Sequence, residues 1–156
     1  MSTTLNPYLS FRDDARAAME FYRDVFGGEL TIDTFASYEM GQEPSENDLV
    51  MHAQLETPAG FTLMASDTPS SMPYVPAAGF SISLSGDDDE ALSAWWAALS
   101  DGGQVTMPLD VPPWGGRFGM LTDRFGIAWM VSIAPRRGLI RAEAAVSASR
   151  RASSSR

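Results

Sequence analysis

The chain has 156 residues, of which 44% are hydrophobic and 20% are charged, which is typical of one soluble globular domain. It contains no cysteine and a single histidine, His52, so disulfides, thiolate nucleophiles and sites built from several histidines are excluded. No stretch is long and apolar enough to cross a bilayer, and the N-terminus lacks the pattern of a secretory signal. We therefore expect a cytoplasmic protein with no membrane partner.

The net charge of −9 is unevenly distributed along the chain. Residues 1–133 hold five arginines and 19 acidic residues, whereas residues 134–156 hold six arginines and one acidic residue. A body this acidic repels phosphate backbones, so we exclude nucleic acid as a partner. Residues 134–156 are rich in Ala, Ser and Arg, and we expect this C-terminal extension to be partly disordered.

The first part of the chain predicts a strand and then a helix. Residues 5–11 alternate between apolar and polar side chains, which indicates a strand. Asp13 or Asp14 then caps a helix that runs to about Phe26 and ends at a glycine pair. Its buried stripe is expected to consist of Ala18, Phe21, Tyr22 and Val25.

Three further strands complete this first unit. They are predicted for ELTIDTFASY, LVMHAQLE and FTLMASD, and the turn TPAG joins the last two into a hairpin. The first unit is thus a β-α-β-β-β module at about residues 5–67.

The same order restarts after a Pro/Ser/Gly-rich bridge at residues 68–79. GFSISLS predicts a half-buried strand, and DDDEALSAWWAALSDGG predicts a helix with an acidic first turn. The buried stripe of this helix is expected to be Leu92, Trp95, Trp96 and Leu99. Strands near QVTMPL, RFGMLTD and IAWMVSI complete a second module at about residues 78–133.

The predicted fold class is therefore α+β, with an internal duplication inside one domain at residues 1–133. Two repeated β-α-β-β-β modules would form a curved mixed sheet around a cleft, with the helices on the convex side. Such a cleft is where a small ligand would bind.

Three segments carry a resemblance to a known family: NPYLSF followed by DDARAAMEFYRDVFGGEL, MHAQL followed by FTLMASD, and WGGRFGMLTDRFGIAWMV. They resemble the vicinal oxygen chelate superfamily, which includes glyoxalase I, extradiol dioxygenases and bleomycin-resistance proteins, and within it the PhnB-like branch. The resemblance covers about residues 5–133 and implies the duplicated fold and a homodimer whose protomers join modules across the interface. Because such folds host many chemistries, the activity has to be argued from the site residues.

The resemblance also implies a place for a metal. Metal-dependent members carry His or Glu ligands on the first, fourth, fifth and eighth strands. The matching positions here are Asn6, Met64, Ser81 and Met130. An amide, a hydroxyl and two thioethers are poor ligands for Zn, Ni, Fe or Mn, so we predict no metal and no other cofactor. A metal-dependent glyoxalase-like or dioxygenase-like enzyme remains an alternative.

Four candidate ligand-binding residues lie on predicted strands. His52 and Gln54 share a strand face with Val50 that we expect to face the cleft, where His52 would serve as a general base. The alternative is that His52 only forms hydrogen bonds with a neighbouring strand and has no catalytic role. Met64 and Met130 would form a flexible apolar floor, unless they only fill the core.

Two further candidates, Trp114 and Arg117, lie in the Pro/Gly-rich loop DVPPWGGRFG. Arg117 would pair with a carboxylate or phosphate of the ligand, or alternatively with an acidic residue of the body.

These residues predict a metal-free small-molecule-binding protein with an apolar or cationic ligand. The first alternative is an enzyme of isomerase or lyase type, with His52 as base and Arg117 as anion clamp. The second is an interaction protein that uses the basic extension as its contact.

Overall fold

The computed structural model describes residues 3–38 and 44–135. The extension predicted at 134–156 lies outside these ranges except for its first two residues. Module 1 comprises β1 (Tyr8–Phe11), α1 (Ala15–Phe26), β2 (Glu29–Thr34), two short 3-10 helices (Ala36–Tyr38 and Pro44–Glu46), β3 (Val50–Glu56) and β4 (Thr62–Asp67). Module 2 comprises β5 (Ile82–Gly86), α2 (Asp89–Ser100), β6 (Gln104–Asp110), β7 (Arg117–Thr122) and β8 (Ala128–Ile133). The predicted α+β class and the duplicated module order are confirmed.

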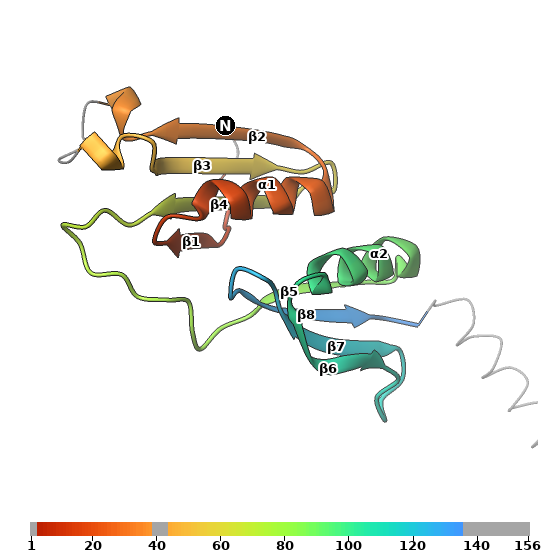
Figure 1. Cartoon of the computed structure of the whole chain (residues 1–156). Helices are drawn as coiled ribbons and strands as arrows, with labels where there is room; N and C mark the ends of the chain where they lie inside the picture. The colour runs from red at the N-terminus through yellow and green to blue at the C-terminus, as the bar shows by residue number, and fades with distance from the viewer. Residues whose placement is uncertain (1–2, 39–43, 136–156) are drawn as a thin grey trace, which may run out of the picture.

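Each module forms its own four-stranded mixed sheet (Figure 1). The strand orders are β1-β4-β3-β2 and β5-β8-β7-β6. In both sheets the first strand pairs parallel with the fourth, and the remaining pairs are antiparallel. The chain within the described ranges therefore builds two four-stranded mixed sheets, one from each predicted module. Neither helix in these ranges has the length and hydropathy that spanning a bilayer requires.

The helix α1 packs on the sheet of module 1 with a face rotated from the predicted one. Its buried residues are Ala15, Ala18, Met19, Tyr22 and Phe26. Phe21 and Val25, which we expected in the stripe, are only partly buried. Asp14 occupies the N-cap position without a side-chain hydrogen bond to the helix.

A carboxylate from the far end of the module caps α1 instead. Asp67, the last residue of β4, accepts hydrogen bonds from the backbone N–H of Ala15 at 2.9 Å and of Val50 at 2.8 Å. One buried side chain thus ties the start of α1 to the start of β3.

The helix α2 begins at a conventional cap and packs more loosely. The side chain of Asp88 accepts a hydrogen bond from the backbone N–H of Ala91. Leu92 and Leu99 are buried as expected, whereas Trp95 and Trp96 are half-buried. The Trp95 ring packs edge-on against Phe26 of α1, with the ring centroids 5.4 Å apart, so this helix also contacts module 1.

A buried carboxylate joins the two modules. Asp123, in the turn between β7 and β8, accepts hydrogen bonds from the Tyr22 hydroxyl of α1 at 2.6 Å and from Trp129 Nε1 at 2.8 Å. Its second oxygen accepts from the backbone N–H groups of Phe125 and Ile127. This cluster fixes α1 of module 1 against the last hairpin of module 2.

The buried Tyr22 hydroxyl predicts a loss of stability in alkali. Burial, followed by the charge of Asp123, raises the pKa of Tyr22 far above its ordinary value. Because the unfolded tyrosine ionises near pH 10 and the folded one does not, the free energy of unfolding should fall above about pH 10, by up to about 1.4 kcal/mol per pH unit. Urea unfolding at pH 8 to about 11 measures this slope. In Tyr22→Phe the free energy of unfolding should fall less steeply with pH, by about 1.4 kcal/mol per pH unit, because one ionising group is lost. An unchanged slope would contradict the raised pKa of Tyr22.

Candidate functional site

Each sheet has one side packed under its helix and one side that we call its open face. Alternate side chains of a strand point to opposite sides, and the helix-side residues, such as Leu9, Leu55 and Val131, are buried. Side chains on the opposite side, such as Tyr8, Gln54 and Met130, are exposed or half-buried. The open faces are therefore the surfaces on which a site can be built.

Strand register aligns equivalent rows of side chains across the two open faces. In module 1 the row is Thr31, Gln54, Met64 and Tyr8. In module 2 the corresponding row is Met107, Met120, Met130 and Ser83. Met64 and Met130 are thus equivalent, as the sequence predicts, and their neighbours on the first strand of each module are Tyr8 and Ser83. Asn6 and Ser81, the other two positions that the resemblance implies, lie just before β1 and β5.

The open face of module 1 holds a tyrosine–histidine pair. The Tyr8 hydroxyl lies 3.1 Å from His52 Nδ1, and either group can donate, depending on the histidine tautomer. Tyr8 is 50% exposed and lies next to Met64, while Asp33 is the direct cross-strand partner of His52. Tyr8 is not among the residues that we predicted, although its alternation with the buried Leu9 places it on this side of the strand.

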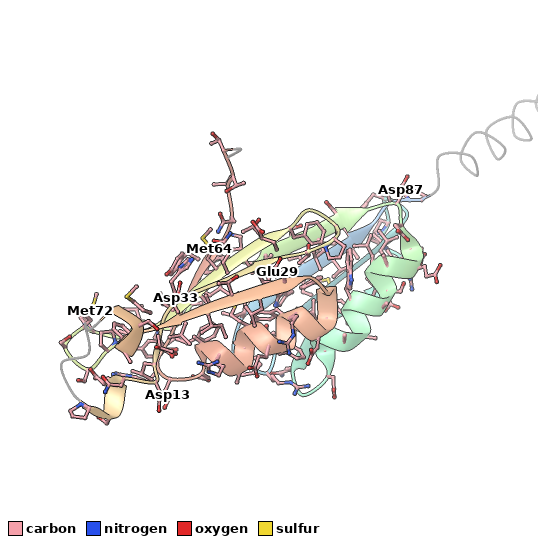
Figure 2. The ribbon with its side chains drawn as sticks, turned by 90° about the horizontal axis from the view of Figure 1, so that it is seen from above. Asp13, Glu29, Asp33, Met64, Met72 and Asp87 are labelled. Carbon is pink, nitrogen blue, oxygen red and sulfur yellow. The ribbon has the colours of Figure 1, made fainter. Side chains whose placement is uncertain are left out.

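The same face is acidic. Glu29 and Asp33 lie on its strands, on the same face as Met64 (Figure 2). Glu56 is the cross-strand partner of Glu29 and accepts a hydrogen bond from Gln54 at 3.2 Å. The sequences of β1 to β4 contain no arginine or lysine. The potential over this face is therefore negative, with an aromatic ring and a thioether in its middle.

The open face of module 2 is apolar. Met120 and Phe118 alternate along β7 on this side, opposite Met107 and Asp110 of β6. Trp114 is 75% exposed and packs edge-on against Phe118, with the ring centroids 6.3 Å apart. Met107, Trp114 and Phe118 line a shallow cavity of about 320 Å³ at the end of the β6–β7 hairpin.

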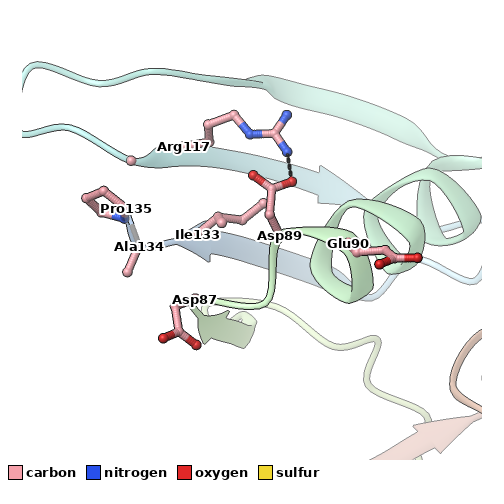
Figure 3. A pocket seen from close by; sticks show the side chains of 8 residues that line it. Asp87, Asp89, Glu90, Arg117, Ile133, Ala134 and Pro135 are labelled. Atoms are coloured by element: carbon pink, nitrogen blue, oxygen red, sulfur yellow. Dashed lines mark hydrogen bonds and ion pairs between the residues drawn. The ribbon is translucent and has the colours of Figure 1, made fainter. Parts of the chain in front are cut away.

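Arg117 lies on the other side of β7, toward α2. Its guanidinium group donates to Asp89 at 2.7 Å and to the hydroxyl of Ser93 at 2.5 Å. Figure 3 shows this side chain reaching from β7 to the start of α2, beside a cavity of about 540 Å³ that Asp87 and Glu90 also line. The structure thus pairs Arg117 with an acidic residue of the body and keeps it away from the open face.

The six predicted residues fall into three places. His52, Gln54 and Met64 lie together on module 1, Met130 and Trp114 lie on module 2, and Arg117 lies on the helix side. Two further cavities, of about 300 and 120 Å³, lie elsewhere in the molecule. None of these four cavities of the described chain is lined by both open faces, so the expected cleft is not among them.

The row positions do not fit the divalent metal that the resemblance implies. The implied positions offer the amide of Asn6, the hydroxyl of Ser81 and the thioethers of Met64 and Met130, and the row members beside the two methionines add the phenol of Tyr8 and the hydroxyl of Ser83. Zn, Ni, Fe and Mn prefer imidazole or carboxylate. Within residues 3–38 and 44–135, no group of three or more His, Asp or Glu residues is placed to hold a metal ion.

Comparison with known proteins assigns the chain to a family. The family model of the Glyoxalase/Bleomycin resistance protein/Dioxygenase superfamily matches residues 4–131. Protein YjdN of Escherichia coli is 30% identical over 142 residues, which cover 83% of this chain and 94% of that protein. The uncharacterized protein Rv0887c of Mycobacterium tuberculosis is 31% identical over 136 residues, which cover 80% of this chain and 71% of that protein.

Solved structures agree with this assignment. Protein PA1353 from Pseudomonas aeruginosa superimposes with a TM-score of 0.72 at 39% identity, covering 86% of this chain and 99% of that one. The PhnB protein from Bacillus cereus, described as a putative 3-demethylubiquinone-9 3-methyltransferase, gives a TM-score of 0.69 at 23% identity, covering 85% and 100%. At that identity the second likeness concerns the fold alone. The chain belongs to the glyoxalase/bleomycin resistance protein/dioxygenase superfamily, with a PhnB protein among its structural neighbours.

Proposed function

We propose that this protein binds a small organic cation with an apolar part on the open face of module 1. The observation that carries this proposal is the Tyr8–His52 pair, which stands exposed among carboxylates on strands that contain no basic residue other than His52. An exposed acidic and aromatic surface attracts cations in preference to anions.

Three side chains of this face have a part in the proposed binding. The Tyr8 ring offers its face to a cation, which is worth about 0.5–2 kcal/mol. Asp33, beside His52, supplies the opposite charge. Met64 lies next to Tyr8 and can adapt to the apolar part of the ligand, because its thioether chain is flexible and polarisable.

The proposal includes a homodimer. A flat sheet covers only one side of a ligand, whereas small-molecule sites bury about 70–90% of the ligand surface. The apolar open face of module 2, taken from a second copy, would supply the missing wall. Native mass spectrometry should find a dimer, and a protein that remains a monomer with ligand bound would contradict this part of the proposal.

The cation preference can be measured with a matched pair of probes. We expect calorimetry to show phenethyltrimethylammonium binding at least about tenfold more tightly than its neutral carbon isostere, a difference of about 1.4 kcal/mol. Asp33→Asn should weaken cation binding by about the same factor. Asp24→Asn, an exposed helix residue with the same loss of charge, should change it less than about twofold. Equal affinity for both probes, or equal effects of both substitutions, would contradict the proposal.

A proton-transfer enzyme is the second candidate. When His52 Nδ1–H donates to the Tyr8 oxygen, the ring is held in place and Nε2 is left free to accept a proton, as a general base must. His52→Ala would then abolish a turnover found among candidate substrates without changing the melting temperature. A ligand recovered chemically unchanged after incubation favours binding alone.

A further inference from the structure

Three methionines stand side by side on the open face of module 2. Met107, Met120 and Met130 are direct cross-strand partners on β6, β7 and β8, and we call them the methionine row. The β6–β7 register shifts on both sides of Met107, but Met107 lines a cavity together with Trp114 and Phe118, which places it on the open face. Directly paired residues on neighbouring strands point to the same side and have Cβ atoms about 4.5–5.5 Å apart. Met107 is 46% exposed, and the other two are half-buried, so the row is reachable from solvent.

The spacing allows the three thioethers to converge. A methionine side chain has three rotatable bonds and carries its sulfur well beyond Cβ. The outer two side chains, on either side of Met120, have to lean only a few ångströms inward for all three sulfurs to meet above it, because neighbouring strands are about 4.8 Å apart.

From this geometry we infer that the methionine row binds one soft monovalent metal ion of the Cu(I) type. Thioether sulfur is a soft, neutral donor, which suits Cu(I) and discriminates against Zn, Mn and Mg. Three neutral donors leave the charge of the ion uncompensated, and a chain with a net charge of −9 favours a cation at its surface.

The surroundings of the row keep the donor set soft. On β7 the residues that flank Met120 on the same face are Phe118 and Thr122, and on β8 those that flank Met130 are Ala128 and Ser132. None of these four is a histidine or a carboxylate, and Asp110 of β6 pairs with Phe118 rather than with a member of the row, so hard ions gain no carboxylate within the row itself. The absence of cysteine from the sequence means that no thiolate competes for the ion.

The equivalent row of module 1 provides the internal control. It has the same place in its sheet and one methionine, Met64, but its other members are Thr31, Gln54 and Tyr8. One thioether gives no chelate, so the inference confines soft-metal binding to module 2. The proposed organic-cation site lies on module 1 and meets the row only in the proposed dimer, where the open face of module 2 is its facing wall. Loss of cation binding in Asp33→Asn and loss of soft-metal binding in the leucine variants are therefore separate results, which distinguish failure of one proposal from failure of the other.

Metal competition tests the inference on the full chain. Under anaerobic conditions with ascorbate, the protein is titrated into the coloured Cu(I) complex of bicinchoninate, and Ag(I) serves as a redox-inert second probe. We expect one equivalent of ion per chain. Replacing all three members of the row by leucine, which conserves volume, should weaken binding at least about tenfold, and Met120→Leu alone by several-fold.

Matched controls decide the outcome. Met64→Leu should leave the affinity within about twofold, and circular dichroism should show every variant folded, as expected for a swap of similar volume. If the triple variant does not fold, the metal affinities of Met120→Leu and Met107→Leu are compared with that of Met64→Leu instead. Failure of the wild-type protein to compete for either ion would overturn the inference. So would retention of binding when the row is replaced, or an equal loss in Met64→Leu.

Discussion

Replacing Asp123 by alanine should lower the free energy of unfolding by about 4 kcal/mol, because several buried hydrogen-bond donors lose their acceptor at once. The side chain is 3% exposed and accepts from the Tyr22 hydroxyl, from Trp129 Nε1 and from two backbone N–H groups. Removing it leaves these donors without an acceptor inside the protein. Urea unfolding followed by tryptophan fluorescence gives the change directly.

Two variants separate this cluster from ordinary polar contacts. Tyr22→Phe removes one hydrogen bond of Asp123 and should cost about 1–2 kcal/mol. Asp101→Ala breaks an exposed ion pair with Arg124 and should cost less than about 1 kcal/mol. If Asp123→Ala is no more damaging than Asp101→Ala, the cluster does not hold the two modules together.

Gly28→Ala is the second change with a large expected effect. Gly28 precedes β2 with a φ of 107°, and a Cβ atom there would lie 2.1 Å from the carbonyl oxygen of Glu56. Backbone cannot give way as a flexible side chain does, so the β2–β3 pairing must distort. We expect a loss of about 3 kcal/mol or more, measured as a fall in the urea midpoint.

Gly60→Ala is the matched control for this substitution. Gly60 also has a positive φ, of 89°, but a Cβ atom there would meet nothing within 4 Å. It therefore reports the backbone strain alone, about 1–2 kcal/mol. Equal effects at Gly28 and Gly60 would show that the close approach to Glu56 costs nothing.

Much of the fold could be predicted because the helices and strands follow from residue patterns within short segments of the sequence. The alternation of Phe80, Ile82 and Leu84 with serines and the apolar spacing after Asp88 each follow from the geometry of one element. The repeat of this order indicates the two modules. The rotation of α1 is not predictable in this way, since Phe21 and Met19 are both apolar and only tertiary packing selects Met19 for the core.

The errors fall where residues distant in sequence meet. Asp67 caps α1 from 52 positions away, so nothing local distinguishes it from the nearer Asp14. Strict alternation predicts Val50 on the face of His52, but Val50 is buried in the core. A register shift between Asp33 and Thr34 opposite β3 explains the change, because an irregularity in a strand pair reverses the parity beyond it.

The candidate site was predictable in part for the same reason. His52, Gln54 and Met64 share a face because strand parity and the hairpin turn place them there. The sequence leaves the partner of Arg117 open, because Asp89 lies 28 positions away on another element. The methionine row requires the register of three strands, which the sequence does not give.

The position of the ligand tests the central claim most directly. With ¹³C-methyl methionine labelling, a titration with phenethyltrimethylammonium reports all nine methionines of the chain at once. The proposed site predicts a shift at Met64, beside Tyr8, and none at Met19, a fully buried residue of α1. A shift confined to the exposed Met72, or an unmoved Met64 at saturation, would contradict a binding site on the open face of module 1.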